Sequence, residues 1–143
     1  MNREIKFRAW ISVTKEMVKV EKIILDIPAI TYTNSKGEKC LDSLKDNAFG
    51  IEIMQSTDLF DKSGNEIYEG DIIGINERYQ ILPKYIVEWN EKHCCFTCID
   101  GGTFNYLGDI DESIQYHLLS NMRLNVCELI GNIYENSELE VGE

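Results

Sequence analysis

The chain has 143 residues, of which 14 are basic and 25 are acidic, so its formal net charge at neutral pH is −11. This length fits one domain, or one domain with a small subdomain, and can bury a hydrophobic core. An acidic field repels phosphate groups, which disfavours non-specific binding of nucleic acid. The charge is uneven, because residues 1–22 carry six basic and three acidic side chains, whereas residues 100–143 carry nine acidic side chains and one basic side chain.

Membrane and disulfide signals are missing from the sequence. No stretch has the run of apolar residues that a membrane span requires, and the N-terminus lacks the apolar core of a secretory signal. The five cysteines are odd in number and lack the spacing of a disulfide framework, which favours reduced thiols. We therefore expect a cytoplasmic protein that does not bind membranes.

Alternating apolar and polar residues predict β-strands along most of the chain. In the first third, these runs lie at residues 5–11, 17–25 and 30–33. Residues 34–37, Asn-Ser-Lys-Gly, predict a hairpin turn after the third run. Residues 41–48 fit either a helical turn or a loop.

Residues 54–73 place two turn signals between three short apolar runs. The first signal is the polar stretch from Asp61 to Asn65, which predicts a loop. The second is Gly70 followed by Asp71. Glycine tolerates the backbone conformation of a sharp bend, and the aspartate carboxylate can accept a hydrogen bond from a nearby backbone amide. We therefore predict a tight β-bend at this pair.

The last part of the chain predicts further strands at residues 72–75, 79–89, 94–99 and 126–134. Ile114, Leu118 and Met122 recur at four-residue spacing, which predicts a short amphipathic helix over residues 111–122. The expected fold is mainly β (β-rich α+β), a small, strongly bent sheet or SH3-like barrel with one short helix. We expect a single domain over residues 1–135 and an acidic C-terminal tail over residues 136–143.

Residues 1–10, 54–73 and 130–139 together resemble the YopX family of phage and prophage proteins. Most members of this family have no established activity, so the resemblance implies a fold and a phage context in a bacterial host. The candidate signature residues are Trp10, Thr57, Leu59, Asp61, Gly64, Ile67, Tyr68, Glu69, Gly70, Asp71, Gly131, Asn132 and Tyr134.

The densest group of reactive side chains lies at His93, Cys94, Cys95 and Cys98. A zinc site normally needs four ligands, usually as two CxxC-like pairs, and the sequence has no second pair. In a strand, the odd offset between Cys95 and Cys98 directs their side chains to opposite faces. We interpret these cysteines as small apolar strand residues and predict neither a metal nor a cofactor.

Catalytic groups are equally weakly indicated. Glu66, Glu69 and Asp71 are close in sequence and could form an acid/base or Mg²⁺ cluster, but capping of a tight bend explains them more simply. His93 and His117 lie in no recognisable catalytic motif, and no phosphate-binding glycine loop is present. We therefore predict that the protein is not an enzyme.

The aromatic side chains are many for a small domain. Stacking of nucleic-acid bases needs neighbouring cations, so core packing is the simpler interpretation and protein recognition the alternative. The residues concerned are Trp10, Tyr68, Tyr79, Tyr85, Trp89, Phe96, Tyr106, Tyr116 and Tyr134.

From these patterns we predict a non-enzymatic accessory protein that acts by protein association, with an unknown protein partner or as a homo-oligomer. The first alternative is a small nucleic-acid-binding module, and the second is an enzyme or metalloprotein that uses Cys94 to Cys98. The nucleic-acid alternative depends on the basic N-terminal residues Arg3, Lys6, Arg8, Lys15, Lys19 and Lys22.

Overall fold

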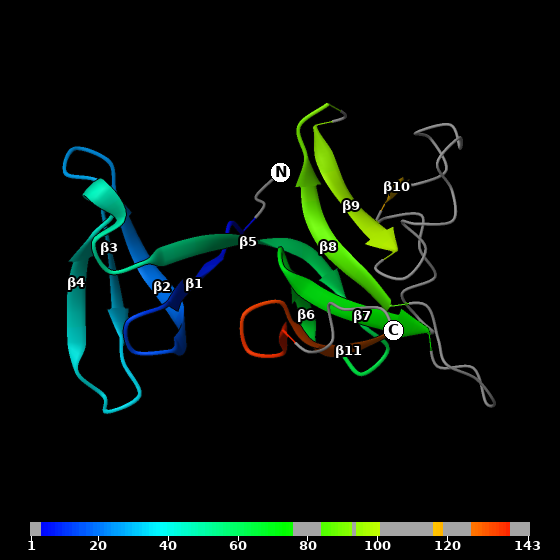
Figure 1. The fold of residues 1–143 in the computed structure, drawn as a ribbon, viewed down its shortest axis with the longest axis horizontal. Helices are drawn as coiled ribbons and strands as arrows, with labels where there is room; N and C mark the ends of the chain where they lie inside the picture. Colours follow the sequence, from blue (N-terminus) through cyan, green and yellow to red (C-terminus); the bar gives the residue numbers. More distant parts are fainter. Residues whose placement is uncertain (1–3, 76–83, 93, 101–115, 119–126, 138–143) are drawn as a thin grey trace. The chain divides into compact units, whose positions relative to one another are not determined.

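The computed structural model describes residues 4–75, 84–92, 94–100, 116–118 and 127–137. Within these ranges the chain is almost entirely β, with antiparallel pairing throughout (Figure 1). The strands are β1 (Phe7–Ile11), β2 (Glu16–Ile24), β3 (Ala29–Thr33), β4 (Lys39–Ser43), β5 (Ile51–Phe60), β6 (Glu66–Tyr68), β7 (Asp71–Ile75), β8 (Lys84–Asn90), β9 (Cys95–Asp100), β10 (Tyr116–Leu118) and β11 (Cys127–Asn132).

The chain divides into two compact units, residues 1–56 (unit 1) and residues 57–143 (unit 2). One sheet has the strand order β4-β3-β2-β1-β5-β6, and the other has the order β10-β9-β8-β7-β11. The ten-residue strand β5 runs through the boundary between the units, so its two ends belong to different units.

Unit 1 owes its core to the period-two pattern of β1 and β2. In β1, Ala9 and Ile11 are buried while their neighbours are partly exposed, as the alternation predicts. β1 pairs with β2 on one side and with β5 on the other. One face of this sheet therefore forms a continuous apolar cluster of Ala9, Ile11, Val18, Val20, Ile30, Tyr32 and Ile51.

The hairpin turn between β3 and β4 has the predicted form. The Asn34 side-chain oxygen accepts hydrogen bonds from the backbone N–H groups of Lys36 and Glu38, at 3.0 and 2.9 Å. Gly37 adopts a φ of 81°, a conformation that glycine tolerates better than other residues. After β4, Lys45–Asn47 form a 3₁₀ turn, so residues 41–48 combine a strand end with a short helical turn.

Unit 2 packs a smaller core between its strands. Ile73 of β7 and Val87 of β8 are fully buried, and β9 contributes Cys98. Ile67 of β6 completes this buried cluster. Partly buried side chains surround it, namely Leu59, Tyr85, Phe96 and Leu129.

The mainly β class is confirmed, but the predicted helix is wrong where it is described, and the barrel alternative to a bent sheet is not formed by the described residues. Tyr116–Leu118 form β10, which pairs with β9, where a helix was predicted. Periodicity cannot separate a helix from a strand over so short an apolar run, and the edge of β9 supplies backbone partners that favour a strand. Residues 111–115 and 119–122 of that helix lie outside the described residues. Within the described ranges neither sheet closes, so the SH3-like barrel is absent.

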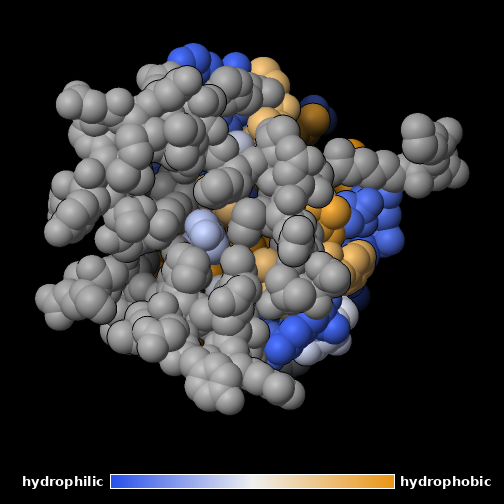
Figure 2. Space-filling view, turned by 90° about the vertical axis from the view of Figure 1, so that its right-hand side faces the viewer, coloured by the Kyte–Doolittle hydropathy of each residue, from blue (hydrophilic) through white to orange (hydrophobic). Residues whose placement is uncertain are grey.

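Several large apolar side chains of the described residues are exposed, among them Leu25, Leu41 and Trp89. In the space-filling view, the coloured residues that are visible include both polar and apolar ones (Figure 2). No helix among the described residues is long and apolar enough to cross a membrane.

Candidate functional site

The predicted bend at Gly70 and Asp71 joins β6 to β7 as the sequence indicates. Gly70 has a φ of 80°, and the carboxylate of Asp71 accepts a 2.7 Å hydrogen bond from the Tyr68 backbone N–H. The Gly70 N–H donates to the carbonyl of Val87 in β8, and its carbonyl accepts from the Ile133 N–H. Asp71 is only 1% exposed. The bend therefore links three segments of unit 2 through its backbone.

Asp61 is the centre of the loop that precedes β6. Its carboxylate accepts hydrogen bonds from the backbone N–H groups of Ser63 and Asn65, at 2.9 and 2.8 Å, and from the Asn65 side-chain amide at 3.0 Å. A further N–H, that of Leu129 in β11, donates to it at 3.0 Å. Burial by itself raises the pKa of this carboxyl, but these donors outweigh burial and lower the pKa to about 2.

A second polar turn follows β11. The side-chain oxygen of Asn132 accepts hydrogen bonds from the backbone N–H groups of Tyr134 and Glu135, at 3.0 and 2.9 Å. Asn136 closes the turn, because its backbone N–H donates to the Asn132 carbonyl and its side-chain oxygen accepts from the Asn132 N–H. Gly131 lies beside this turn, where an added Cβ would overlap the Asn136 side chain.

The other signature residues of unit 2 support the same region. The Thr57 hydroxyl donates to the carbonyl of Ile67 at 2.7 Å and accepts from the Leu59 N–H at 3.2 Å. Ile67 is fully buried, and Leu59 packs against its cluster. The Tyr68 hydroxyl donates to the Glu66 carboxylate at 3.2 Å.

Signature residues are thus gathered in unit 2, apart from Trp10. Trp10 lies in β1 of unit 1, where it is opposite Met17 of β2 and Glu52 of β5. The carboxylates of Asp61 and Asp71 bind backbone N–H groups of neighbouring turns. This arrangement identifies them as groups that position loops, and for Asp61 the converging donors favour the charged form of the carboxyl.

The buried cysteines fit the interpretation as apolar strand residues, whereas that interpretation is wrong for Cys94, which is exposed in the turn before β9 with a φ of 50°. Cys98 in β9 and Cys127 in β11 are fully buried, and burial raises the pKa of the Cys127 thiol. A raised pKa disfavours the nucleophilic thiolate. Cys95 and Cys98 both lie in β9, so their odd offset separates their side chains to opposite faces, as predicted. Among the described residues, no three Asp, Glu, His or Cys side chains converge as metal ligands would.

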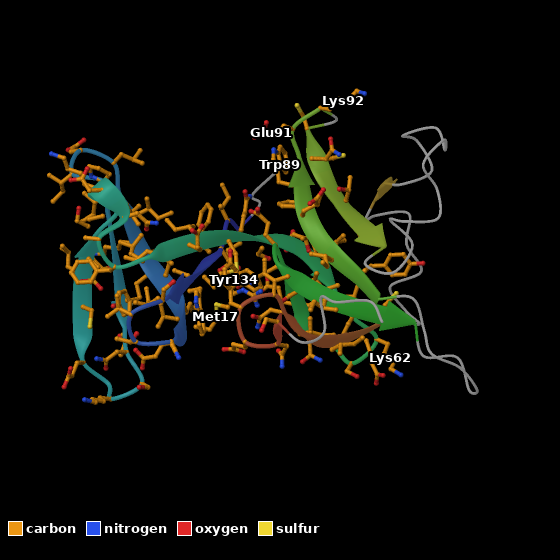
Figure 3. All side chains as sticks on the ribbon, viewed as in Figure 1. Met17, Lys62, Trp89, Glu91, Lys92 and Tyr134 are labelled. Atoms are coloured by element: carbon orange, nitrogen blue, oxygen red, sulfur yellow. The ribbon has the colours of Figure 1, made fainter. Side chains whose placement is uncertain are left out.

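The described surface carries an aromatic pair on the hairpin of β8 and β9. Trp89 is directly opposite Phe96, and their ring centroids lie 5.1 Å apart with an interplanar angle of 75°. Phe96 packs against the core of unit 2, whereas Trp89 is 44% exposed. Figure 3 places Trp89 near the end of β8, with Glu91 and Lys92 in the turn that follows. The pair therefore connects the core of unit 2 to the surface, close to the acidic Glu91 and the basic Lys92.

Sequence and structure comparisons agree with this architecture. The YopX protein family profile matches residues 6–139, so the chain belongs to the YopX family. The chain is also similar to the crystal structure of protein EF1440 from Enterococcus faecalis, with 27% sequence identity and a TM-score of 0.60. That match covers 97% of this chain and 99% of the other. No curated protein matches the sequence.

Sequence reasoning missed the long-range partners of the signature residues. The hydrogen bond from the Leu129 N–H to the Asp61 carboxylate joins residues that are 68 positions apart, and no local sequence pattern predicts it. The Asn132 turn was detectable, because an Asn followed by polar residues often accepts from the backbone two positions later. The pairing of Trp89 with Phe96 follows from the register of the hairpin, which the sequence does not specify.

Proposed function

We propose that this YopX family member is a non-enzymatic phage or prophage accessory protein that acts by binding another protein in the cytoplasm of a bacterial host. The observation that supports this proposal is the exposed Trp89, which Phe96 holds edge-on. Tryptophan is enriched among the residues that dominate binding energy, and a ring fixed by its neighbour loses little conformational freedom on binding.

The signature carboxylates support the proposal from a second direction. Asp61 and Asp71 are buried and accept hydrogen bonds from backbone N–H groups. These two carboxylates therefore stabilise loops. Recognition of a partner by exposed apolar side chains is the activity that the described geometry favours. Trp89 lies near the turn that carries Glu91 and Lys92, so an apolar side chain and charged side chains are both available to a partner (Figure 3).

The test is affinity capture from the lysate of a bacterial host with three purified proteins, at low and moderate salt. The wild-type chain is expected to retain a discrete protein at moderate salt, and Trp89→Ala is expected to lose it. Leu25→Ser is the matched control, because Leu25 is 85% exposed in unit 1 and its loss should leave binding unchanged. A partner that binds Trp89→Ala as well as wild type would contradict the proposal, as would the absence of any partner.

A second candidate function is contact with single-stranded nucleic acid through unit 1. Arg8 of β1 is directly opposite Lys19 of β2, so these two cations lie on neighbouring strands. Trp10 follows Arg8 by two positions and therefore shares its face of the sheet. Cations beside an aromatic ring are the elements of a base-stacking surface.

Salt dependence separates the two functions. If unit 1 binds nucleic acid, the affinity for a labelled oligonucleotide falls steeply with salt. The slope of the logarithm of the binding constant against the logarithm of the salt concentration should become shallower by about 1.4 in the double variant Arg8→Gln, Lys19→Gln. This is the change expected for the loss of two phosphate contacts on a single strand. Lys62→Gln in unit 2 is the control and should leave the slope unchanged. No binding at low salt would remove this candidate.

A further inference from the structure

β4 is a terminal strand of the first sheet, and no strand among the described residues pairs with its outer edge. The Asn34 N–H donates to the Glu38 carbonyl, and the Leu44 N–H donates to the Pro28 carbonyl. Hydrogen-bonded pairs alternate in an antiparallel ladder, so Cys40 and Asp42 of β4 are the residues that bond to β3. The backbone groups of Lys39, Leu41 and Ser43 therefore point away from β3.

β11, the terminal strand of the second sheet, differs from β4 because a loop covers its outer edge. β11 ends the second sheet, and the loop before β6 lies against it. The Lys62 N–H donates to the Cys127 carbonyl at 3.0 Å, and the Asp61 carboxylate accepts from the Leu129 N–H. Unpaired edges invite pairing with another strand, and covering them is a common protection. Among the described residues, none covers β4 in this way.

The side chains of β4 favour an added strand. Leu41 is 57% exposed although it lies in the middle of the strand. It continues a cross-strand row from Lys22 through Thr31. A shallow hollow of about 300 Å³ is lined by this row together with Glu21, Lys39 and Cys40. An exposed leucine on an open edge is the arrangement expected of a strand-addition surface.

The sequence of β4 is self-complementary. If two copies pair antiparallel about Leu41, Leu41 is opposite Leu41 and Lys39 is opposite Ser43 in both directions. These three pairs are the ones whose backbone groups point outward, so each can exchange both of its N–H···O bonds. Cys40 is then opposite Asp42. No directly opposite pair contains like charges, which would destabilise the contact.

The charge distribution favours contact through unit 1. Residues 1–56 carry nine basic and eight acidic side chains, a net charge of +1. Since the whole chain has a net charge of −11, residues 57–143 have a net charge of −12. Two copies that meet through unit 1 bring together almost neutral surfaces. Contact through unit 2 would oppose two strongly acidic ones.

We propose that β4 is a homodimerisation edge, at which two copies of this chain pair antiparallel about Leu41 and join their sheets. The inference deepens the proposed association function by naming a second copy of the chain as one partner. It does not depend on Trp89, so either proposal can fail while the other stands.

The first test is sedimentation equilibrium of the purified full chain over a range of concentrations. Wild type is expected to form dimers, and Leu41→Pro is expected to weaken dimerisation at least about tenfold, since proline removes the outward N–H but no bond to β3. Leu25→Ser is the control, with dimerisation unchanged. Circular dichroism checks that each variant is folded. A wild-type monomer at all concentrations would overturn the proposal.

A charge-pairing experiment tests the two-fold contact even if Leu41→Pro fails to fold. Leu41→Lys alone and Leu41→Glu alone each place like charges opposite one another and should be monomeric. Mixed in equal amounts, they should form a heterodimer, because the lysine of one chain is then opposite the glutamate of the other. Single variants that dimerise as wild type does would place the interface elsewhere, and a mixture without heterodimer would exclude the Leu41 register.

Discussion

Asp61 shows how one side chain can hold distant segments together. Burial disfavours its charged form, but four hydrogen-bond donors converge on it, three of them backbone N–H groups. The effect of these donors exceeds that of burial, because the pKa of the carboxyl falls to about 2. A buried donor that loses its acceptor costs about 1–3 kcal/mol. Asp61 is therefore more important for stability than any exposed ion pair of this loop.

The free energy of unfolding should depend on pH through the ionisation of Asp61. Its pKa is lower in the folded state than the value of about 3.9 in an unfolded chain, so its contribution is present above pH ~4 and is lost as the pH falls towards ~2. That contribution is up to about 2 kcal/mol. We expect Asp61→Asn to be destabilised at neutral pH, and the difference from wild type to shrink between pH ~4 and ~2.

This difference is measured by denaturant unfolding at several pH values. The chain has two tryptophans, Trp10 in unit 1 and Trp89 in unit 2, so a Trp10→Phe background leaves Trp89 as the fluorescence reporter of unit 2. Asp26→Asn, in the exposed turn after β2, is the control and should change the unfolding free energy by less than about 0.5 kcal/mol. A difference that does not vary with pH would contradict the role given to Asp61.

Gly131 makes a steric prediction at the same scale. A Cβ at this position would overlap the side chain of Asn136, so Gly131→Ala should destabilise unit 2 by about 1–3 kcal/mol. In an Asn136→Ala background the same substitution should cost less, because the overlapping amide is gone. A double-mutant cycle by denaturant unfolding measures this coupling. Additive effects would show that the overlap is not the cause.

The loop of residues 61–65 acts as an element that covers the edge of β11. It makes three kinds of contact with β11. These are a backbone hydrogen bond from Lys62, the hydrogen bond of the Asp61 carboxylate and the ion pair between Lys62 and Glu128 at 3.0 Å. The two charged side chains are 31% and 43% exposed, so solvent screens them. Hydrogen bonds of the buried carboxylate therefore dominate the attachment of the loop.

Removing the ion pair should have little effect. Lys62→Ala is expected to lower the free energy of unfolding by at most about 1 kcal/mol, because exposed ion pairs contribute little. Asp61→Ala should lower it by about 2–4 kcal/mol, since several buried donors lose their acceptor. Both variants are compared by urea unfolding in low and moderate salt. Equal losses would show that the ion pair contributes as much as the carboxylate and would contradict this ranking.

At the scale of the whole molecule, the charge is concentrated in one unit. Unit 2 has five basic and seventeen acidic side chains, a net of −12, whereas unit 1 is almost neutral. Like charges at this density repel one another and disfavour the compact state. Salt screens this repulsion over a Debye length of about 10 Å at 0.1 M.

Stability should therefore rise with ionic strength. We expect the Tm of the chain to increase by a few degrees between about 10 and 150 mM salt, because screening reduces repulsion within unit 2. Differential scanning calorimetry with sodium chloride and with potassium chloride separates screening from specific ion binding. A Tm that falls with salt would mean that attractive ion pairs outweigh the repulsion.

The sequence by itself determined the local features of this protein. The period-two pattern located β1, β2 and β3, and Gly37 and Gly70 marked turns that require a positive φ, because these features depend only on neighbouring residues. The carboxylate of Asp71 was correctly predicted to accept a nearby amide. The YopX resemblance is confirmed over residues 6–139.

Only the tertiary structure decided which distant residues meet. Pairing with β9 makes Tyr116–Leu118 a strand despite its helical spacing, and the partner of Asp61 is an N–H 68 residues away. Register places Phe96 under Trp89 and directs the backbone groups of Leu41 away from β3. Such contacts depend on how strands pair, and backbone groups pair without regard to side-chain identity, so the sequence does not encode them locally.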